Sequence, residues 1–409
     1  MRGSRKQSVR ISATSDRLIP LGAGLAAIPE RLLLAHARGE VLFIAGAGIS
    51  QSVDLPNFRG LVLRVYEQLD IAVHEILSGI PLTAHNKWRI DLSSLTDQQA
   101  AEVKRFLGGD YDVVLGMLER RIEGRSHGKS RVRQAVESVL LIPGIKPAPI
   151  HRALMHLADR GGAVTIVTTN FELLLEDAAK RSRPVIQTYA LGGIPRPGYG
   201  DDFAGVLHIH GAFDRNSART SDLILTDQDF GEFYLRRRVV PDLIYDAARL
   251  FNLVLVGYSA NDPPMRYLLN AVAADGNRFG GFKERFTFVG GNPPDPHLLE
   301  DWKGRGITPI PYDDSKDHSA LLATLERWAA LSAINGKRSL VDAEIKRIVR
   351  KSRGASIDAE RDLFDHLFRR CDMKERERLS ALASAKKADI SWLEAIAEIA
   401  GDTYLERSR

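Results

Sequence analysis

Short apolar runs alternate with amphipathic segments along the middle of the chain. Each run ends in glycine or in polar residues, which is the pattern of a strand buried on both faces of a sheet. The runs cover residues 41–45, 163–167, 205–209, 223–225, 253–256, 286–289 and 307–310. Between several of them apolar positions recur with a helical period, at residues 171–181, 241–250, 264–273 and 320–330. This alternation predicts an α/β fold with a Rossmann-like, mostly parallel sheet.

Two regions depart from the alternation. Residues 61–141 carry a helical pattern without a strand, which predicts a helical insertion between the first and second strands. Residues 338–409 repeat their apolar positions every three or four residues, which predicts a C-terminal helical module. We therefore expect a basic N-terminal tail over 1–29, an α/β domain over 30–333 that contains the insertion, and the helical module.

The positive charge is concentrated at the N-terminus. The 409 residues are 44% hydrophobic and 27% charged, with a formal net charge of +5. Five arginines and lysines against the single acid Asp16 give +4 within the first seventeen residues, so the remainder is nearly balanced. A short basic tail is more typical of a solubilising segment than of a specific DNA contact. We therefore do not expect direct nucleic-acid binding.

Cysteine content and hydropathy limit the classes of protein to which the chain can belong. The single cysteine, Cys371, excludes an internal disulfide framework and a cysteine-based zinc site. No run approaches the roughly 18–20 apolar residues of a membrane helix, and the N-terminus has no apolar signal core. We expect a cytoplasmic protein without a membrane segment and without a metal.

The first apolar run is followed directly by Gly46-Ala47-Gly48-Ile49-Ser50. Glycines let a backbone approach a pyrophosphate closely, and the N–H groups of such a turn attract anions. The alternative is an ordinary tight turn. A second glycine-rich segment, 124–130, is similar to a P-loop but has three residues instead of four between its glycines and follows a helical pattern, so we discount it.

Two later strand ends carry polar side chains. Thr168, Thr169 and Asn170 follow the second run, at the edge where open α/β sheets bind ligands. An asparagine there can bind a ribose hydroxyl or a water, although it can also cap the next helix. His208 and His210 are two residues apart on a strand, so both imidazoles are expected on one face. His210 is the better candidate base, and His208 alone is equally well explained as a structural histidine.

The fourth strand end is a buried run that breaks into small and polar residues at Gly257-Tyr258-Ser259. Gly257 and Ser259 leave room for an adenosine ribose. Asp262 either binds a hydroxyl group or caps the next helix. Any one of the four strand ends is ordinary, whereas all four in this order are not.

In this order the motifs resemble the Sir2 superfamily. Gly46 to Ser50 is similar to its first phosphate loop, and Leu55-Pro56-Asn57-Phe58-Arg59 resembles its Pro-Asp-Phe-Arg segment. Thr168 to Glu172 resembles Thr-Gln-Asn-Ile-Asp, and His210-Gly211 resembles the catalytic His-Gly. The resemblance implies Asn170 and His210 as catalytic residues. The expected cofactor-binding residues are Gly46, Ala47, Gly48, Ser50, Phe58, Arg59, Thr169, Gly257, Ser259 and Asp262.

Departures from the family pattern narrow the expected activity. Protein deacetylases of the family carry a four-cysteine zinc module that this chain lacks, and Glu172 stands where the family has an Asp that contacts the nicotinamide amide. The motifs look closer to bacterial Sir2-like domains of antiphage defence, which deplete NAD. The resemblance therefore implies hydrolysis of NAD, as substrate, to nicotinamide and ADP-ribose. The alternatives are an NAD-dependent protein deacylase and a non-catalytic nucleotide-binding module.

The resemblance also implies control by other proteins. Such domains commonly work with a sensor, and no sensor is evident within the α/β core. We therefore expect a homo-oligomer, built in part by the helices of the insertion and the C-terminal module, and a partner such as a HerA-like ATPase.

Overall fold

The computed structural model describes residues 17–81, 90–124, 129–179, 186–198, 203–213, 223–258 and 281–407. Contacts divide the chain into two compact units, one of residues 39–336 and one of residues 1–38 together with 337–409. In the described part of the chain, no helix is both long enough and apolar enough to cross a membrane.

The larger unit is built on a seven-stranded parallel sheet in the order β5-β6-β4-β3-β7-β8-β9. The chain runs from the central strand β3 to β4 on one side and later returns to β7 on the other, so the strand order reverses at β3. Open α/β sheets bind ligands at the carboxyl ends of the strands at such a reversal. The strands are β3 (Val41–Ala45), β4 (Thr165–Thr168), β5 (Thr188–Ala190), β6 (Gly205–His208), β7 (Asn252–Val256), β8 (Arg285–Gly290) and β9 (Thr308–Tyr312).

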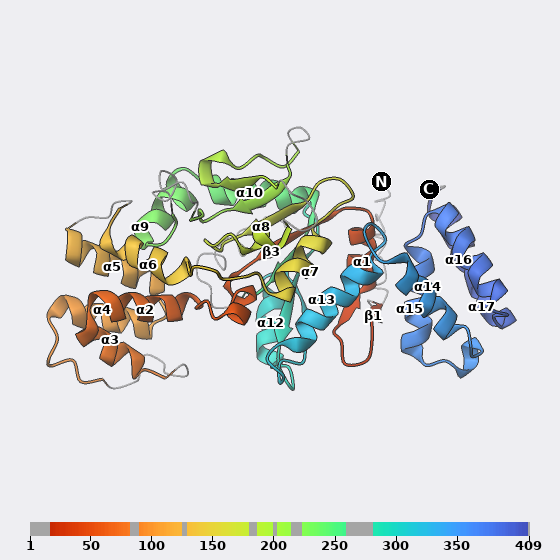
Figure 1. Cartoon of the computed structure of the whole chain (residues 1–409), viewed down its shortest axis with the longest axis horizontal. Coiled ribbons are helices and arrows are strands. Elements are labelled where there is room, and N and C mark those ends of the chain that lie inside the picture. Colours follow the sequence, from red (N-terminus) through yellow and green to blue (C-terminus); the bar gives the residue numbers. More distant parts are fainter. Residues whose placement is uncertain are drawn as a thin grey trace, which may run out of the picture. The chain divides into compact units, whose positions relative to one another are not determined.

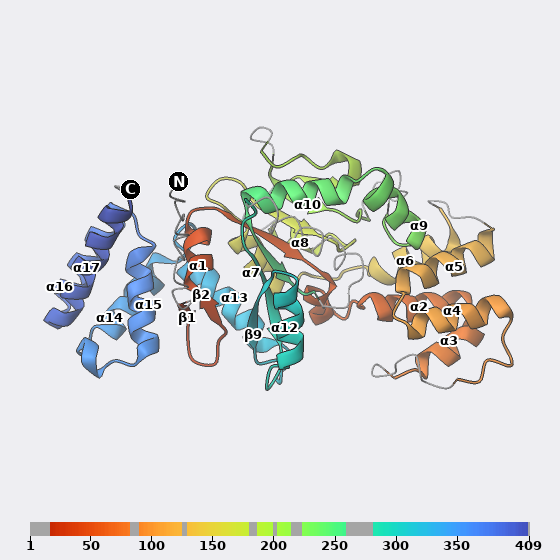
Figure 2. The same cartoon turned by 180° about the vertical axis from the view of Figure 1, so that it is seen from behind.

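Helices cover both faces of this sheet because its strands are apolar on both sides (Figures 1 and 2). Leu42 and Ile44 share one buried cluster with α10 (Val239–Leu250) and α12 (Pro296–Gly304). Phe43 points to the opposite face, where its ring lies 5.5 Å from that of Trp328. On that face α13 (Ser319–Leu331) packs on α7 (Pro149–Leu157), which contacts α8 (Leu174–Ala179). The predicted α/β fold with a parallel sheet is confirmed.

Six of the seven predicted strands form, with ends within two residues of those expected. The exception is 223–225, which is not a strand. Its three side chains are buried, and the Ile224 N–H donates to the carbonyl of His210, but the segment pairs with no strand. The strand β5 was not predicted because it has only three half-buried residues. The helix expected over 264–273 lies outside the described residues.

Between β3 and β4 the chain forms a set of helices with its own apolar core, and the buried residues Phe213, Leu223 and Leu225 join that core. Figure 1 shows these helices in orange and yellow, beside α9 (Asp227–Phe230). The helices are α2 (Phe58–Leu69), α3 (Ile71–Ser78), α4 (Asp97–Leu107), α5 (Tyr111–Glu123) and α6 (Arg131–Leu140).

Two arginine–aspartate pairs join the helices α5 and α6 to α9. Arg120 binds both carboxylate oxygens of Asp227, at 2.9 and 3.2 Å. Arg133 binds both oxygens of Asp229, at 2.8 and 2.7 Å, and also donates to Glu119 and to the carbonyl of Leu223. The Arg133 side chain is 5% exposed, whereas that of Arg120 is 32% exposed. The buried Arg133–Asp229 ion pair is therefore the stronger interaction, since solvent screens the Arg120–Asp227 pair.

Replacing Arg133 with alanine should lower the free energy of unfolding by about 3 kcal/mol, because it leaves the fully buried Glu119 without this cation. Arg120→Ala is the matched control and should cost about 1 kcal/mol or less, because its ion pair is a third exposed. Urea denaturation of both variants measures the difference. Equal losses would contradict the assignment of Arg133 as the main tie.

The smaller unit contains a two-stranded antiparallel sheet of β1 (Leu18–Pro20) and β2 (Ala27–Pro29), followed by α1 (Glu30–Ala37). The rest of the described part of this unit is mainly helical. Its helices are α14 (Arg338–Ile348), α15 (Asp358–Arg369), α16 (Met373–Ala385) and α17 (Ile390–Arg407).

The N-terminal region differs from the expected tail. Residues 17–29 contain β1 and β2, in which Ile19 and Ile28 pair with each other and are fully buried. Residues 1–16 lie outside the described residues. The first helix also belongs to the unit of the C-terminal helices instead of the α/β domain expected to begin at residue 30. Its Glu30 binds Arg369 through both carboxylate oxygens at 3.0 Å, a contact that the local sequence pattern does not reveal.

Candidate active site

Four strands end side by side where the strand order reverses. In the parallel register Ala45 pairs with Thr168 on one side and with Val256 on the other, and Thr168 pairs with His208. The four motifs singled out in the sequence therefore leave the sheet from one row of residues. This is the edge at which ligand-binding side chains are expected.

The two glycine-rich loops contact each other through their backbones. The Gly48 N–H donates to the carbonyl of Gly257 at 3.0 Å, and the Gly46 N–H donates to the carbonyl of Val256 at 2.9 Å. A Cβ atom on Gly48 would lie 2.8 Å from the Gly257 Cα, closer than two such atoms approach. After Gly46 the chain makes two short 3-10 turns, Ala47–Ile49 and Gln51–Val53. These glycines therefore pack the first loop against the loop after β7.

Ser50 closes that first loop and is the centre of a buried polar network. Its Oγ lies 2.5 Å from Glu172 Oε1, 3.2 Å from Asn170 Nδ2 and 3.3 Å from His151 Nε2. These side chains come from three different segments, and each is less than a tenth exposed. Their contacts join the first loop to the segment after β4 and to α7.

Asn170 is held through its backbone and its side chain. Its N–H donates to Thr168 Oγ1 at 3.0 Å, and its side-chain Nδ2 donates to Ser50 and, at 3.0 Å, to Glu172. Its Oδ1 is buried and accepts no hydrogen bond among the described residues. The following helix begins only at Leu174, and the side chain bonds to Ser50 and Glu172, so Asn170 is not placed as a helix cap.

The network has a defined direction of hydrogen bonding. His151 Nδ1 accepts from the Ala148 N–H at 3.2 Å, so in the neutral ring Nε2 carries the hydrogen and donates to Ser50. Burial lowers the pKa of His151 to about 4, which keeps the ring neutral at pH 7. Ser50 in turn donates to Glu172. Burial raises the pKa of Glu172, and its hydrogen bonds with Ser50 and Asn170 oppose that shift only in part.

The two histidines have different partners. His208 is the last residue of β6 and is fully buried, with Nδ1 2.8 Å from the carbonyl oxygen of Asn170 and Nε2 2.9 Å from Glu176. β6 ends at His208, one residue earlier than expected, and residues 209 and 210 form a turn. The alternation of side chains along a strand therefore does not determine where the His210 side chain points. His210 Nε2 lies 2.7 Å from the Tyr234 hydroxyl, and burial lowers the pKa of His210 to about 3.

An unusual helical turn holds His210. Tyr234 belongs to a π-helical turn, Gly231–Arg236, and the residue before that turn, Phe230, also contacts the imidazole ring. The centroid of the His210 ring lies 5.6 Å from the ring centroid of Phe230 and 5.9 Å from that of Tyr234. π-Helical turns frequently occur at functional sites. Two aromatic side chains, Phe230 and Tyr234, thus hold the imidazole of His210 in place.

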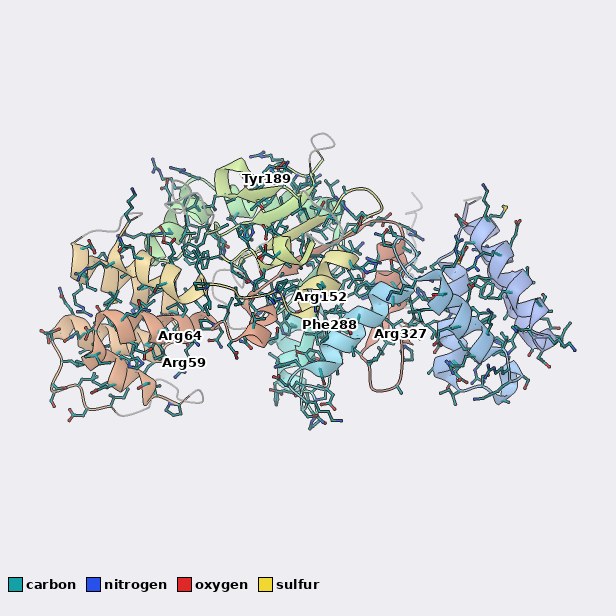
Figure 3. All side chains as sticks on the ribbon, viewed as in Figure 1. Arg59, Arg64, Arg152, Tyr189, Phe288 and Arg327 are labelled. Atoms are coloured by element: carbon teal, nitrogen blue, oxygen red, sulfur yellow. The ribbon has the colours of Figure 1, made fainter. Side chains whose placement is uncertain are left out.

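Other predicted binding residues take different positions. Thr169 Oγ1 lies 3.0 Å from the Tyr258 hydroxyl, beside the glycine contact. Arg59, labelled in Figure 3, donates to the carbonyl of Ile80 at 2.5 Å and stacks over Phe106, so it binds within the helical insertion. Phe58 packs edge-on against Tyr111, also within the insertion. Ser259 and Asp262 lie outside the described residues.

Three residues of this site were not predicted from the sequence: His151, Glu176 and Tyr234. His151 and Glu176 are buried polar residues within helices, and Tyr234 is an aromatic residue in a π-helical turn, so in the sequence each is explained by packing alone. Their partners are distant in sequence, so local periodicity carries no signal for them. Within the described ranges, no three His, Cys, Asp or Glu side chains come together as metal ligands.

Comparison with known sequences gives two matches. Residues 164–310 match the family model described as the SIR2-like domain, and this range includes Asn170, His208, His210 and Gly257. The uncharacterized protein y4cA of Sinorhizobium fredii (strain NBRC 101917 / NGR234) is 31% identical over 362 residues. That match covers 84% of this chain and 28% of y4cA, so the chain spans little more than a quarter of that relative's length.

Solved Sir2 structures share a distant likeness with the chain. One is described as "Structural Basis for the Mechanism and Regulation of Sir2 Enzymes", with 15% identity, a TM-score of 0.32, and coverage of 73% of this chain and 96% of that one. Another, a Sir2 homologue in complex with NAD, has the same identity and TM-score, and the match covers 75% of this chain and 96% of that one. The SIR2-like match over 164–310 agrees with the family resemblance of the strand-end motifs.

Proposed function

We propose that this chain hydrolyses NAD to nicotinamide and ADP-ribose, with Asn170 and His210 as its catalytic residues. The observation that carries the proposal is the Asn170 side chain, whose Nδ2 donates to Ser50 and Glu172 while its buried Oδ1 has no partner among the described residues. An unsatisfied buried carbonyl oxygen costs about 1–3 kcal/mol. A ligand hydroxyl or a water that donates to Oδ1 removes this cost.

The expected substrate follows from the position of the site and from the family match. The site lies at the carboxyl edge of a parallel sheet, at the reversal of strand order where dinucleotides bind in such folds. The SIR2-like match spans Asn170 and His210. Beside these residues the loops of Gly48 and Gly257 contact each other through their backbones, and a Cβ atom on either glycine would clash with the opposite loop. These observations support a nicotinamide dinucleotide over other anions.

In the proposed reaction a water attacks C1′ of the nicotinamide ribose. The bond between C1′ and the ring nitrogen breaks, and its electron pair passes to that nitrogen, which releases neutral nicotinamide. The water also loses one proton, which His210 accepts. In this step the neutral His210 ring donates its Nε2 hydrogen to the Tyr234 hydroxyl oxygen, which leaves Nδ1 without a hydrogen, so Nδ1 takes the proton. Asn170 Oδ1 accepts a hydrogen bond from the ribose or from the water, and so orients the reacting groups.

The direct test is incubation of the purified full chain with NAD, alone and together with the products of its genomic neighbours. Chromatography should detect nicotinamide and ADP-ribose in equal amounts, and a chelator should leave the rate unchanged. NAD that is bound but stays intact under every condition would favour the nucleotide-binding module. Consumption of NAD only in the presence of an acylated peptide would favour the deacylase. The expected homo-oligomer and HerA-like partner stay predictions.

A further inference from the structure

His208 contacts the main chain of the proposed catalytic residue. Its imidazole is fully buried, and Nδ1 lies 2.8 Å from the carbonyl oxygen of Asn170. A carbonyl oxygen only accepts hydrogen bonds, so Nδ1 must carry a hydrogen. Together with the bond from the Asn170 N–H to Thr168 Oγ1, this contact fixes the backbone on both sides of the Asn170 Cα.

The second ring nitrogen of His208 faces a carboxylate. Nε2 lies 2.9 Å from Glu176 Oε1, which also accepts from Thr188 Oγ1 at 2.9 Å. The other oxygen of Glu176 is buried without a hydrogen-bond partner among the described residues. The charge and hydrogen bond of Glu176 raise the pKa of His208, which favours the imidazolium, the form in which both ring nitrogens carry hydrogens and the ring donates both bonds. A buried ion pair is expensive, and its net contribution to stability is small.

We propose that His208, held by Glu176, is a positioning residue that fixes the peptide of Asn170 so that Oδ1 stays directed into the site. This inference rests on the proposed function of Asn170. It assigns the two histidines different tasks, since His210 meets the reacting atoms and His208 acts only through Asn170. The carboxylate of Glu176 keeps both ring nitrogens of His208 as donors.

The arrangement makes the site sensitive to alkaline pH. Burial disfavours the charged form of His208, but the charge and hydrogen bond of Glu176, the Asn170 carbonyl and the charge of Glu172 outweigh it, so the pKa of His208 is raised. Among the described residues, these two carboxylates, on α8 and after β4, are the charged groups that act on the ring. The pKa of His208 in the folded chain is above its value in the unfolded chain, which is about 6.5. The stabilisation that the charged ring provides is therefore complete at pH values below about 6.5 and is lost as the pH rises through the raised pKa.

Glu176→Gln tests the proposal because it removes the charge that keeps His208 protonated and preserves the size of the side chain. The alkaline limb of the pH profile of kcat should move down by about one to three pH units, while KM changes little. Glu176→Asp keeps the negative charge, so its alkaline limb should move down less than that of Glu176→Gln. The matched control is His156→Gln, since His156 Nε2 also bonds a carbonyl oxygen, that of Asn335, outside the catalytic network. Its profile should coincide with that of the wild type.

A second readout does not depend on activity. In the full chain labelled with ¹⁵N-histidine, nuclear magnetic resonance should show both nitrogens of His208 still protonated at a pH at which exposed histidines have lost their proton, and the side-chain amide signals of Asn170 should titrate together with that ring. In Glu176→Gln both transitions should move to lower pH. A His208 ring that loses its proton at the same pH as exposed histidines, or an alkaline limb that Glu176→Gln leaves in place, overturns this inference. Failure of the wild type to hydrolyse NAD would overturn the proposed function and leave the resonance result to decide the role of His208.

Discussion

Alanine in place of Asn170 should lower the rate of nicotinamide release by about 10²–10⁴-fold, because the variant loses the group that orients the ribose or the water. The fold should survive. Ser50 and Glu172 still bind each other directly at 2.5 Å, and the peptide of residue 170 still donates to Thr168. Chromatographic measurement of nicotinamide, under a condition in which the wild type is active, determines the loss, and thermal unfolding reports on stability.

Asn335→Ala is the control for that experiment. Asn335 is also an asparagine whose side chain is tied to the protein, since its Nδ2 donates to the carbonyl of Asp159 at 2.7 Å, but it lies outside the catalytic network. Its turnover should stay within about twofold of the wild type, as expected for a residue without a transition-state contact. Turnover at the wild-type rate by Asn170→Ala would remove Asn170 from the mechanism.

Gly257→Ala should destabilise the larger unit and disorganise the site. Residue 257 has φ of +77°, and a Cβ atom there would lie 2.7 Å from the Ile49 nitrogen and 2.9 Å from the Gly46 carbonyl oxygen. The left-handed backbone costs about 1–3 kcal/mol for a residue with a side chain, and the overpacking adds about 1–3 kcal/mol. The free energy of unfolding should therefore fall by up to about 6 kcal/mol, as measured by urea denaturation.

Gly304→Ala provides the comparison. No atom lies within 4 Å of a Cβ at Gly304, and the residue ends α12 without a left-handed backbone. The expected change is within about 0.5 kcal/mol, as for other surface substitutions. If Gly257→Ala proves as stable as Gly304→Ala, the two loops do not form the tight contact described above.

Strand ends could be predicted because they depend on local sequence. A buried strand that stops in glycine or in polar residues has a strong local pattern, and β3, β4, β6 and β7 all show it. The parallel α/β arrangement then places those ends in one row. The family resemblance of the motifs added the roles of these residues.

The rest of the site depends on long-range packing. His151 reaches Ser50 across 101 residues, and Tyr234 reaches His210 from a π-helical turn that no helical periodicity indicates. Arg59 was expected at the cofactor because of its motif, yet it stacks on Phe106, which lies 47 positions later in the chain. The apolar run 223–225 has the pattern of a strand, but its burial comes from packing, since Leu223 and Leu225 join the core of the insertion and Ile224 joins the core beside the sheet.

The contact between the two glycine loops consists of backbone atoms and therefore constrains how this chain can change in evolution. Side-chain contacts can drift, because an enlarged residue can be offset by a smaller neighbour. Where Gly48 meets Gly257 neither residue has a side chain to shorten, so a substitution on one loop cannot be offset on the other. Gly46, Gly48 and Gly257 are thus expected to be inherited as a set by every descendant that keeps this loop arrangement. A lineage that loses one of them must rebuild both loops.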